Sequence, residues 1–177
     1  MTEFPRKIHI IGSTGSGKTY LAKHLSKQLK IPCFELDKVM WSGSVEMAGK
    51  NPPEVREKLL NEVILQDSWI VEGVYYKWLD KSFTLADKII FLTPNKYLRD
   101  LRIINRFIKQ RTGIEKSNYR QTLKGLMEMI KWNHGFEGQK KKEIIEMLKP
   151  YEDKLIMLKN NNEIINKGNS EKPSDFT

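Results

Sequence analysis

Positions 12–19 form the segment whose residue types and spacing indicate chemistry most clearly. The segment fits the pattern G-x-x-x-x-G-K-[ST] without a mismatch and reads Gly12-Ser13-Thr14-Gly15-Ser16-Gly17-Lys18-Thr19. Glycines let such a loop turn its backbone N–H groups inward around an anion, and a following helix adds its positive amino end. In this pattern Lys18 bridges the β and γ phosphates of a nucleotide, and the Thr19 hydroxyl ligates Mg²⁺. The segment predicts a nucleoside triphosphate site; the alternative is a glycine-rich turn without a ligand.

Two carboxylates are predicted to lie beside this loop, because each ends a short apolar run. Glu72 follows the run at 69–71, and Asp37 follows the run at 33–36. The carboxyl ends of parallel strands meet at one edge of a sheet, where such folds bind their ligands. Asp37 is expected there as the base that accepts a proton from an acceptor hydroxyl, or else as the cap of a short helix. Trp41 either walls an acceptor pocket or belongs to the core.

Basic residues are unevenly distributed along the chain. Lys+Arg number 31 and Asp+Glu 22, a net charge of +9. Residues 1–94 contribute +2 (13 − 11), residues 95–149 contribute +8 (14 − 6) and residues 150–177 contribute −1 (4 − 5). The basic stretch either faces an anionic partner or forms a solvated surface. Within it, Arg102 and Arg106 share one helix face at i, i+4, and Arg111 follows them. Arginine suits phosphate because its planar fork binds oxygens bidentately.

Short apolar runs alternate with helical patterns, which is typical of a parallel sheet covered by helices. We expect five strands, at about residues 8–11, 33–36, 69–71, 88–92 and 155–158. Helices are expected at about residues 18–30, 52–66, 96–110, 119–132 and 139–148. Gly113, Gly135 and Gly138 are expected to mark the breaks between the last three helices. The polar segment between Gln110 and Tyr119 is expected to be a mobile flap.

Other classes of phosphate-binding protein fit poorly. A GTPase requires D-x-x-G and N-K-x-D, whereas this chain has no D-x-x-G and its segment Asn95-Lys96-Tyr97-Leu98 ends in leucine. A motor ATPase should pair an aspartate with a glutamate at a strand end, and the run before Gly73 ends in a single acid. Small-molecule kinases that use ATP remain. The three histidines are isolated and no cluster has metal-ligand spacing, so no structural metal is expected.

The chain is expected to be a cytoplasmic protein of one domain. Its apolar runs fall far short of the ~20 residues of a membrane-spanning helix, and its first residues do not read as a secretory leader. A single cysteine, Cys33, excludes an intramolecular disulfide and fits a reducing compartment. We expect the domain to cover residues 1–166, with a lid region at about 95–149 and a flexible tail at 167–177. The sequence does not indicate an oligomeric state.

Four pieces of the sequence carry a resemblance to a known family. They are the segment at 12–19, Leu36-Asp37-Lys38-Val39-Met40-Trp41, Trp69-Ile70-Val71-Glu72-Gly73-Val74-Tyr75 and the set Arg102, Arg106 and Arg111. From about residue 5 to 165 the chain resembles the adenylate-kinase-like P-loop proteins known as DNA topology modulation proteins. The resemblance implies a nucleoside-monophosphate-kinase fold, with a five-stranded parallel sheet of order 2-3-1-4-5 that binds ATP and Mg²⁺.

The resemblance also implies roles for individual residues. Glu72 is similar in position to the aspartate of the D-G-F-P-R segment in adenylate kinases, which implies that it orients a water on Mg²⁺; the alternative is a solvated strand-end carboxylate. Arg102 and Arg106 resemble the R-x-x-x-R pair that clamps the nucleotide at the root of a kinase lid, with Arg111 beyond it. Asp37 is similar in position to a residue that binds substrate hydroxyls in shikimate kinases. The segments that hold AMP in adenylate kinases are missing, so ordinary AMP phosphorylation is not expected.

Two functional hypotheses follow. The first is an ATP-dependent phosphotransferase acting on a small-molecule acceptor that the sequence does not identify. The second is a nucleotide-dependent nucleic-acid binder, supported by the basic stretch, by Lys140-Lys141-Lys142 and by the name of the family. We rank it second because a kinase lid needs the same arginines. No helix-turn-helix, zinc finger or aromatic stacking platform is evident in the sequence.

Overall fold

A five-stranded parallel sheet forms the centre of the protein, as a computed structural model shows for residues 5–42, 49–115, 121–161 and 163. Its strands are β1 (Lys7–Gly12), β2 (Cys33–Glu35), β5 (Trp69–Gly73), β6 (Lys88–Leu92) and β7 (Leu155–Leu158). Their order is β2-β5-β1-β6-β7, and every pairing is parallel. Counted within this sheet alone the order is 2-3-1-4-5, which confirms the predicted α/β class and topology.

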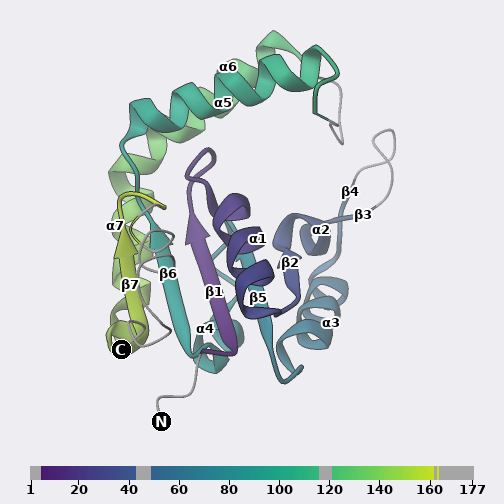
Figure 1. The fold of residues 1–177 in the computed structure, drawn as a ribbon, viewed down its shortest axis with the longest axis vertical. Coiled ribbons are helices and arrows are strands. Elements are labelled where there is room, and N and C mark those ends of the chain that lie inside the picture. The colour runs from purple at the N-terminus through teal and green to yellow at the C-terminus, as the bar shows by residue number, and fades with distance from the viewer. Residues whose placement is uncertain (1–4, 43–48, 116–120, 162, 164–177) are drawn as a thin grey trace.

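Helices cover both faces of the sheet and bury its apolar side chains (Figure 1). On one face Leu21 and Leu25 of α1 (Lys18–Leu29) pack against Ile8, Ile10 and other side chains of the sheet. The other face is covered by α3 (Pro53–Ile64), α4 (Asp80–Leu85) and α7 (Lys141–Leu148). Apolar residues at helical spacing give each helix one buried stripe, so the sheet is buried on both sides.

The basic stretch forms a two-helix arm above the carboxyl ends of the strands (Figure 1). We use "arm" for α5 (Lys96–Arg111) and α6 (Leu123–Gly135), which follow β6 and pack against each other. The arm returns to the sheet through a π-helical segment (Phe136–Lys140), a 3-10 helix (Lys149–Lys154) and the intervening α7. At its root the buried Arg99 pairs with Glu137. This ion pair ties the first turn of α5 to the return segment.

The structure differs from the sequence expectations in three places. A short antiparallel pair, β3 (Trp41–Ser42) and β4 (Gly49–Lys50), follows α2 (Leu36–Met40) and was not expected. Helix α4 was also missed, because it spans only six residues. No coil separates α6 from α7: the chain stays helical through Gly135, and the kink falls at Gly138, with φ −83° and ψ −123°. Part of the expected flap (116–120) and the expected tail (167–177) lie outside the described residues.

None of the helices that the structure describes is both long and apolar enough to cross a membrane.

Removing the Phe91 ring should destabilise the fold. Phe91 lies on β6, is fully buried and packs edge-on against Phe136, with ring centroids 6.3 Å apart. Phe91→Ala leaves a cavity between the sheet and the return segment and should cost about 3–5 kcal/mol in the free energy of unfolding. Denaturant unfolding, monitored by circular dichroism, measures this loss of free energy of unfolding. Leu65→Ala, at a side chain that is 74% exposed, is the control; equal losses for the two variants would contradict this packing.

Candidate active site

The loop between β1 and α1 turns so sharply that it requires glycine at two positions. Gly15 and Gly17 have φ of 74° and 94°, a region that side chains disfavour. A Cβ at Gly15 would lie 2.7 Å from the backbone oxygen of Arg99, and one at Gly17 would lie 2.4 Å from Asn161 Nδ2. The predicted glycine loop is therefore formed at the carboxyl end of the central strand, and other elements pack directly against it.

Lys18 lies buried beside this loop, and its ammonium donates a hydrogen bond to the Ser13 carbonyl at 2.9 Å. Burial lowers the pKa of Lys18 to about 8, and the charges of Glu72 and Asp37 oppose that shift. Arg106 lowers the pKa further. These three side chains lie within electrostatic reach of Lys18 although they come from three different segments. The structure thus gathers most of the predicted site residues around one ammonium group.

Thr19 and Glu72 meet at the start of α1. The Thr19 hydroxyl donates to Glu72 Oε1 at 2.6 Å, and Glu72 is only 5% exposed. Burial raises the pKa of Glu72, while Lys18 and the Thr19 hydrogen bond oppose the rise. The solvated-carboxylate alternative for Glu72 is therefore wrong. A hydroxyl beside one carboxylate is the oxygen donor set that suits Mg²⁺ when phosphate oxygens complete the shell, so these residues fit the ion.

Asp37 lies near this group and is held by an aromatic pair. Tyr75 donates its hydroxyl hydrogen bond to Asp37 Oδ1 at 2.9 Å, and Trp41 Nε1 donates to the Tyr75 oxygen at 3.2 Å. Helix α2 begins at Leu36, its capping position is Glu35, and no side-chain capping bond is present, so the expectation of Asp37 as a cap is wrong. Trp41 is 44% exposed, which is inconsistent with a core role.

The three predicted arginines, Arg102, Arg106 and Arg111, are spaced along the length of α5. Arg102 Nη1 donates to the carbonyl oxygens of Ser16 at 2.9 Å and Gly15 at 3.4 Å, so it contacts the glycine loop directly. Arg106 lies one turn further and contacts the Met129 sulfur at 3.6 Å. Arg111 lies at the end of α5 with its guanidinium 5.9 Å from the Phe107 ring. The structure brings Arg102 and Arg106 to the site, whereas Arg111 lies about two and a half helical turns beyond Arg102.

Two residues of the site were not assigned a role from the sequence. Asn161 follows β7, is buried, and donates its Nδ2 hydrogen bond to the Gly17 carbonyl at 3.1 Å. Tyr75 orients Asp37, as described above. No sequence spacing relates either residue to its partner, because each contact joins segments far apart in the chain. The one sequence feature that could have indicated these residues is that each follows soon after a strand, at the edge of the sheet where such folds bind ligands.

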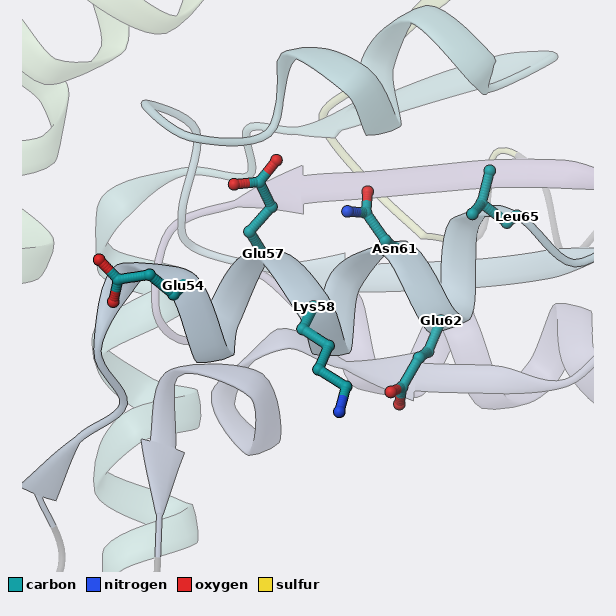
Figure 2. Close-up of a pocket in the computed structure, with 6 residues that line it drawn as sticks. All are labelled: Glu54, Glu57, Lys58, Asn61, Glu62 and Leu65. Carbon is teal, nitrogen blue, oxygen red and sulfur yellow. The ribbon is translucent and has the colours of Figure 1, made fainter.

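A surface hollow on α3 is not part of this site. It is lined by six residues of that one helix: Glu54, Glu57, Lys58, Asn61, Glu62 and Leu65. Figure 2 shows that Glu57 and Asn61 point away from the direction taken by Lys58 and Glu62, so the side chains do not converge on one point. The hollow therefore lacks the converging polar groups of a binding site.

The fold is similar to that of solved small-molecule kinases. One similar solved structure is the shikimate kinase from Acinetobacter baumannii in complex with shikimate, with 14% identity, a TM-score of 0.53, and coverage of 96% of this chain and 97% of that chain. Another is an unliganded sugar kinase from Janibacter sp., with 14% identity, a TM-score of 0.51, and coverage of 92% and 91%. No family model and no curated protein matches this sequence. At this identity the likeness shows the fold alone.

Nucleotide binding should be coupled to proton uptake by Lys18. With a pKa of about 8, Lys18 is about half neutral at pH 8, and bound phosphate favours its charged form. Binding of Mg-ADP near pH 8 should therefore take up a fraction of a proton. Calorimetry in buffers of different ionisation enthalpy measures this uptake. It should largely vanish near pH 7, where Lys18 is already charged; equal uptake at both pH values would contradict the assignment.

Proposed function

We propose that the protein is an ATP-dependent phosphotransferase that moves the γ phosphate of ATP to a hydroxyl of a small-molecule acceptor. The observation that carries the proposal is the joining of a glycine loop, a buried lysine, the Thr19–Glu72 pair and Asp37 at one edge of the sheet. A phosphoryl-transfer site needs these parts: a phosphate cradle, charge neutralisation and a group that receives the acceptor proton.

Each residue has a proposed role in this reaction. The backbone of residues 12–19 holds the phosphates, and Lys18 bridges the β and γ phosphates. Thr19 would ligate Mg²⁺ and Glu72 would hold it through water; when bound, the ion would supply positive charge that balances the phosphate oxygens. Asp37 accepts the hydroxyl proton of the acceptor. Arg102 and Arg106 hold the transferring phosphate once the Arg102 bonds to the loop carbonyls are exchanged for phosphate oxygens, and Arg111 approaches it from further along the arm.

The names of the two fold neighbours, a shikimate kinase and a sugar kinase, agree with an acceptor that bears hydroxyl groups. The proposal also includes the resemblance to DNA topology modulation proteins. It further includes a single domain over residues 1–166 and a cytoplasmic location. In that domain the arm acts as the lid.

Replacing Asp37 tests the chemistry of the proposal. Asp37→Asn keeps the shape of the side chain but removes the base, so transfer to the acceptor should fall by ~10² or more while ATP binding stays nearly unchanged. Coupled ADP-release assays with a panel of polyols, sugars and nucleosides measure the rate. Tyr75→Phe, which keeps the carboxylate and removes only its hydrogen bond, should lose less. Lys18→Met serves as the inactive reference. Undiminished transfer by Asp37→Asn would contradict the role of Asp37 as the base.

Arg106 separates the kinase from the nucleic-acid alternative, which the basic surface of the arm favours. If the arm is a lid, Arg106→Ala should cut turnover far more than it weakens ATP affinity. DNA binding should then be weak and steeply salt-dependent, because a basic surface alone binds through counterion release. Filter binding at two salt concentrations, alongside turnover, measures both activities.

The matched control for Arg106 is the double variant Lys140→Ala, Lys142→Ala, since both lysines are exposed. Lys141 is left unchanged because its ammonium lies 3.2 Å from Glu137, the partner of Arg99. The control should keep its turnover. Two results together would favour the nucleic-acid binder. DNA binding would be tight and sequence-selective at physiological salt and would depend on these lysines, and turnover would be unchanged by Arg106→Ala.

A further inference from the structure

Arg56, on the first turns of α3, carries a guanidinium group without a carboxylate partner among the described residues. Its Nη1 contacts the Met40 sulfur at 3.7 Å, and its Nε is buried and has no hydrogen-bond partner. Arg99 also has buried unpaired nitrogens, but its charge is balanced by the ion pair with Glu137. Burying part of an arginine costs free energy unless an anion or acceptor pairs with it. Arg56 therefore carries a positive charge that a bound anion would neutralise.

A second unpaired donor lies against Arg56. The Arg56 guanidinium stacks over the Trp78 ring at 5.4 Å, and Trp78 Nε1 is also buried without a partner. An indole N–H and a guanidinium only donate hydrogen bonds. Two adjacent donors with no acceptor are complementary to oxygen atoms, and the positive charge favours oxygens that carry negative charge.

These donors border the residues proposed to hold the acceptor. Met40, which Arg56 contacts, lies on the same short helix as Asp37. The Trp78 ring packs 6.2 Å from the ring of Tyr75, which donates to Asp37. Burial raises the pKa of Tyr75, and the charge of Arg56 is among the influences that oppose this rise, so the guanidinium lies within electrostatic reach of the Tyr75 hydroxyl. Asp37 and Arg56 are therefore linked through the neighbouring side chains of Tyr75 and Trp78.

Given the proposed phosphotransferase activity, on which this inference rests, we propose that the acceptor is an anion. Arg56 and Trp78 bind a carboxylate or phosphate group of the acceptor, and Asp37 faces the hydroxyl that receives the γ phosphate. Arginine matches either group because its fork pairs with two oxygens at once. The substrate class is a small hydroxy acid or a phosphorylated polyol rather than a neutral sugar or nucleoside.

Direct anion binding tests the site separately from catalysis. The glycine loop is first saturated with Mg-ADP, so that added anions do not bind there. Inorganic phosphate and acetate are then titrated while tryptophan fluorescence is recorded, with Trp78→Phe used to locate the signal. At least one anion should bind saturably, and Arg56→Met should weaken it about tenfold or more. Arg56→Lys should retain part of the affinity. Lys58→Met, an exposed cation on the same helix, should leave binding unchanged.

Thermal unfolding and turnover complete the test. Arg56→Met removes an unpaired charge, so its melting temperature should match or exceed that of the parent protein; a marked decrease would indicate a structural role and overturn the inference. Turnover is compared for shikimate against its methyl ester and for glucose phosphate against glucose. Only anionic members should be phosphorylated, with Arg56→Met raising KM more than it lowers kcat. Whichever of acetate and phosphate binds more tightly indicates whether the charged group of the acceptor is a carboxylate or a phosphate.

The two proposals fail in different ways. Arg56-dependent anion binding without phosphorylation of any acceptor would leave the anion site standing and count against the kinase. Phosphorylation of neutral acceptors at rates indifferent to Arg56 would support the kinase and overturn the anionic acceptor. Absence of saturable, Arg56-dependent binding of both phosphate and acetate would also overturn it.

Discussion

The sharp turn at Gly15 and Gly17 is the constraint on which the rest of the site depends. Because neither position has room for a Cβ, the backbone of Arg99 and the side chain of Asn161 approach the loop directly. The first turn of α5 and the chain after β7 are therefore fixed relative to a loop that ends the central strand. A side chain at Gly15 would press on the backbone of Arg99, and one at Gly17 would displace the amide of Asn161 from its place against the loop.

Around that turn, opposite charges from separate elements are held close together. Lys18 of α1 is buried, and its charged form is favoured mainly by Glu72 on β5 and Asp37 on α2. Desolvation strengthens every such interaction, because little water remains to screen it. The site is arranged to receive additional negative charge, since Arg102 and Arg106 reach it from the arm. The guanidinium of Arg56, which has no carboxylate partner among the described residues, extends the same pattern to the proposed acceptor side.

The sequence predicted the strands of the sheet and the glycine loop because those features follow local rules, whereas the strand order was expected only from the family resemblance. Apolar runs locate β1, β5 and β6 directly, and the motif at 12–19 specifies its own turn. The contacts of Asp37 with Tyr75 and of Asn161 with Gly17 were beyond prediction, since each joins distant segments through tertiary packing. Of the two glycines expected to mark the break after α6, Gly138 does so, whereas Gly135 continues the helix.

Transfer of the γ phosphate to a small molecule is the central claim, and an isotope label follows it most directly. The protein is incubated with a small-molecule extract and ATP that carries heavy oxygen on its γ phosphate, and the products are analysed by mass spectrometry. We expect the labelled phosphoryl group to appear on one class of small molecule, with little labelled inorganic phosphate. Label found only in inorganic phosphate, or retained wholly in ATP, would contradict it.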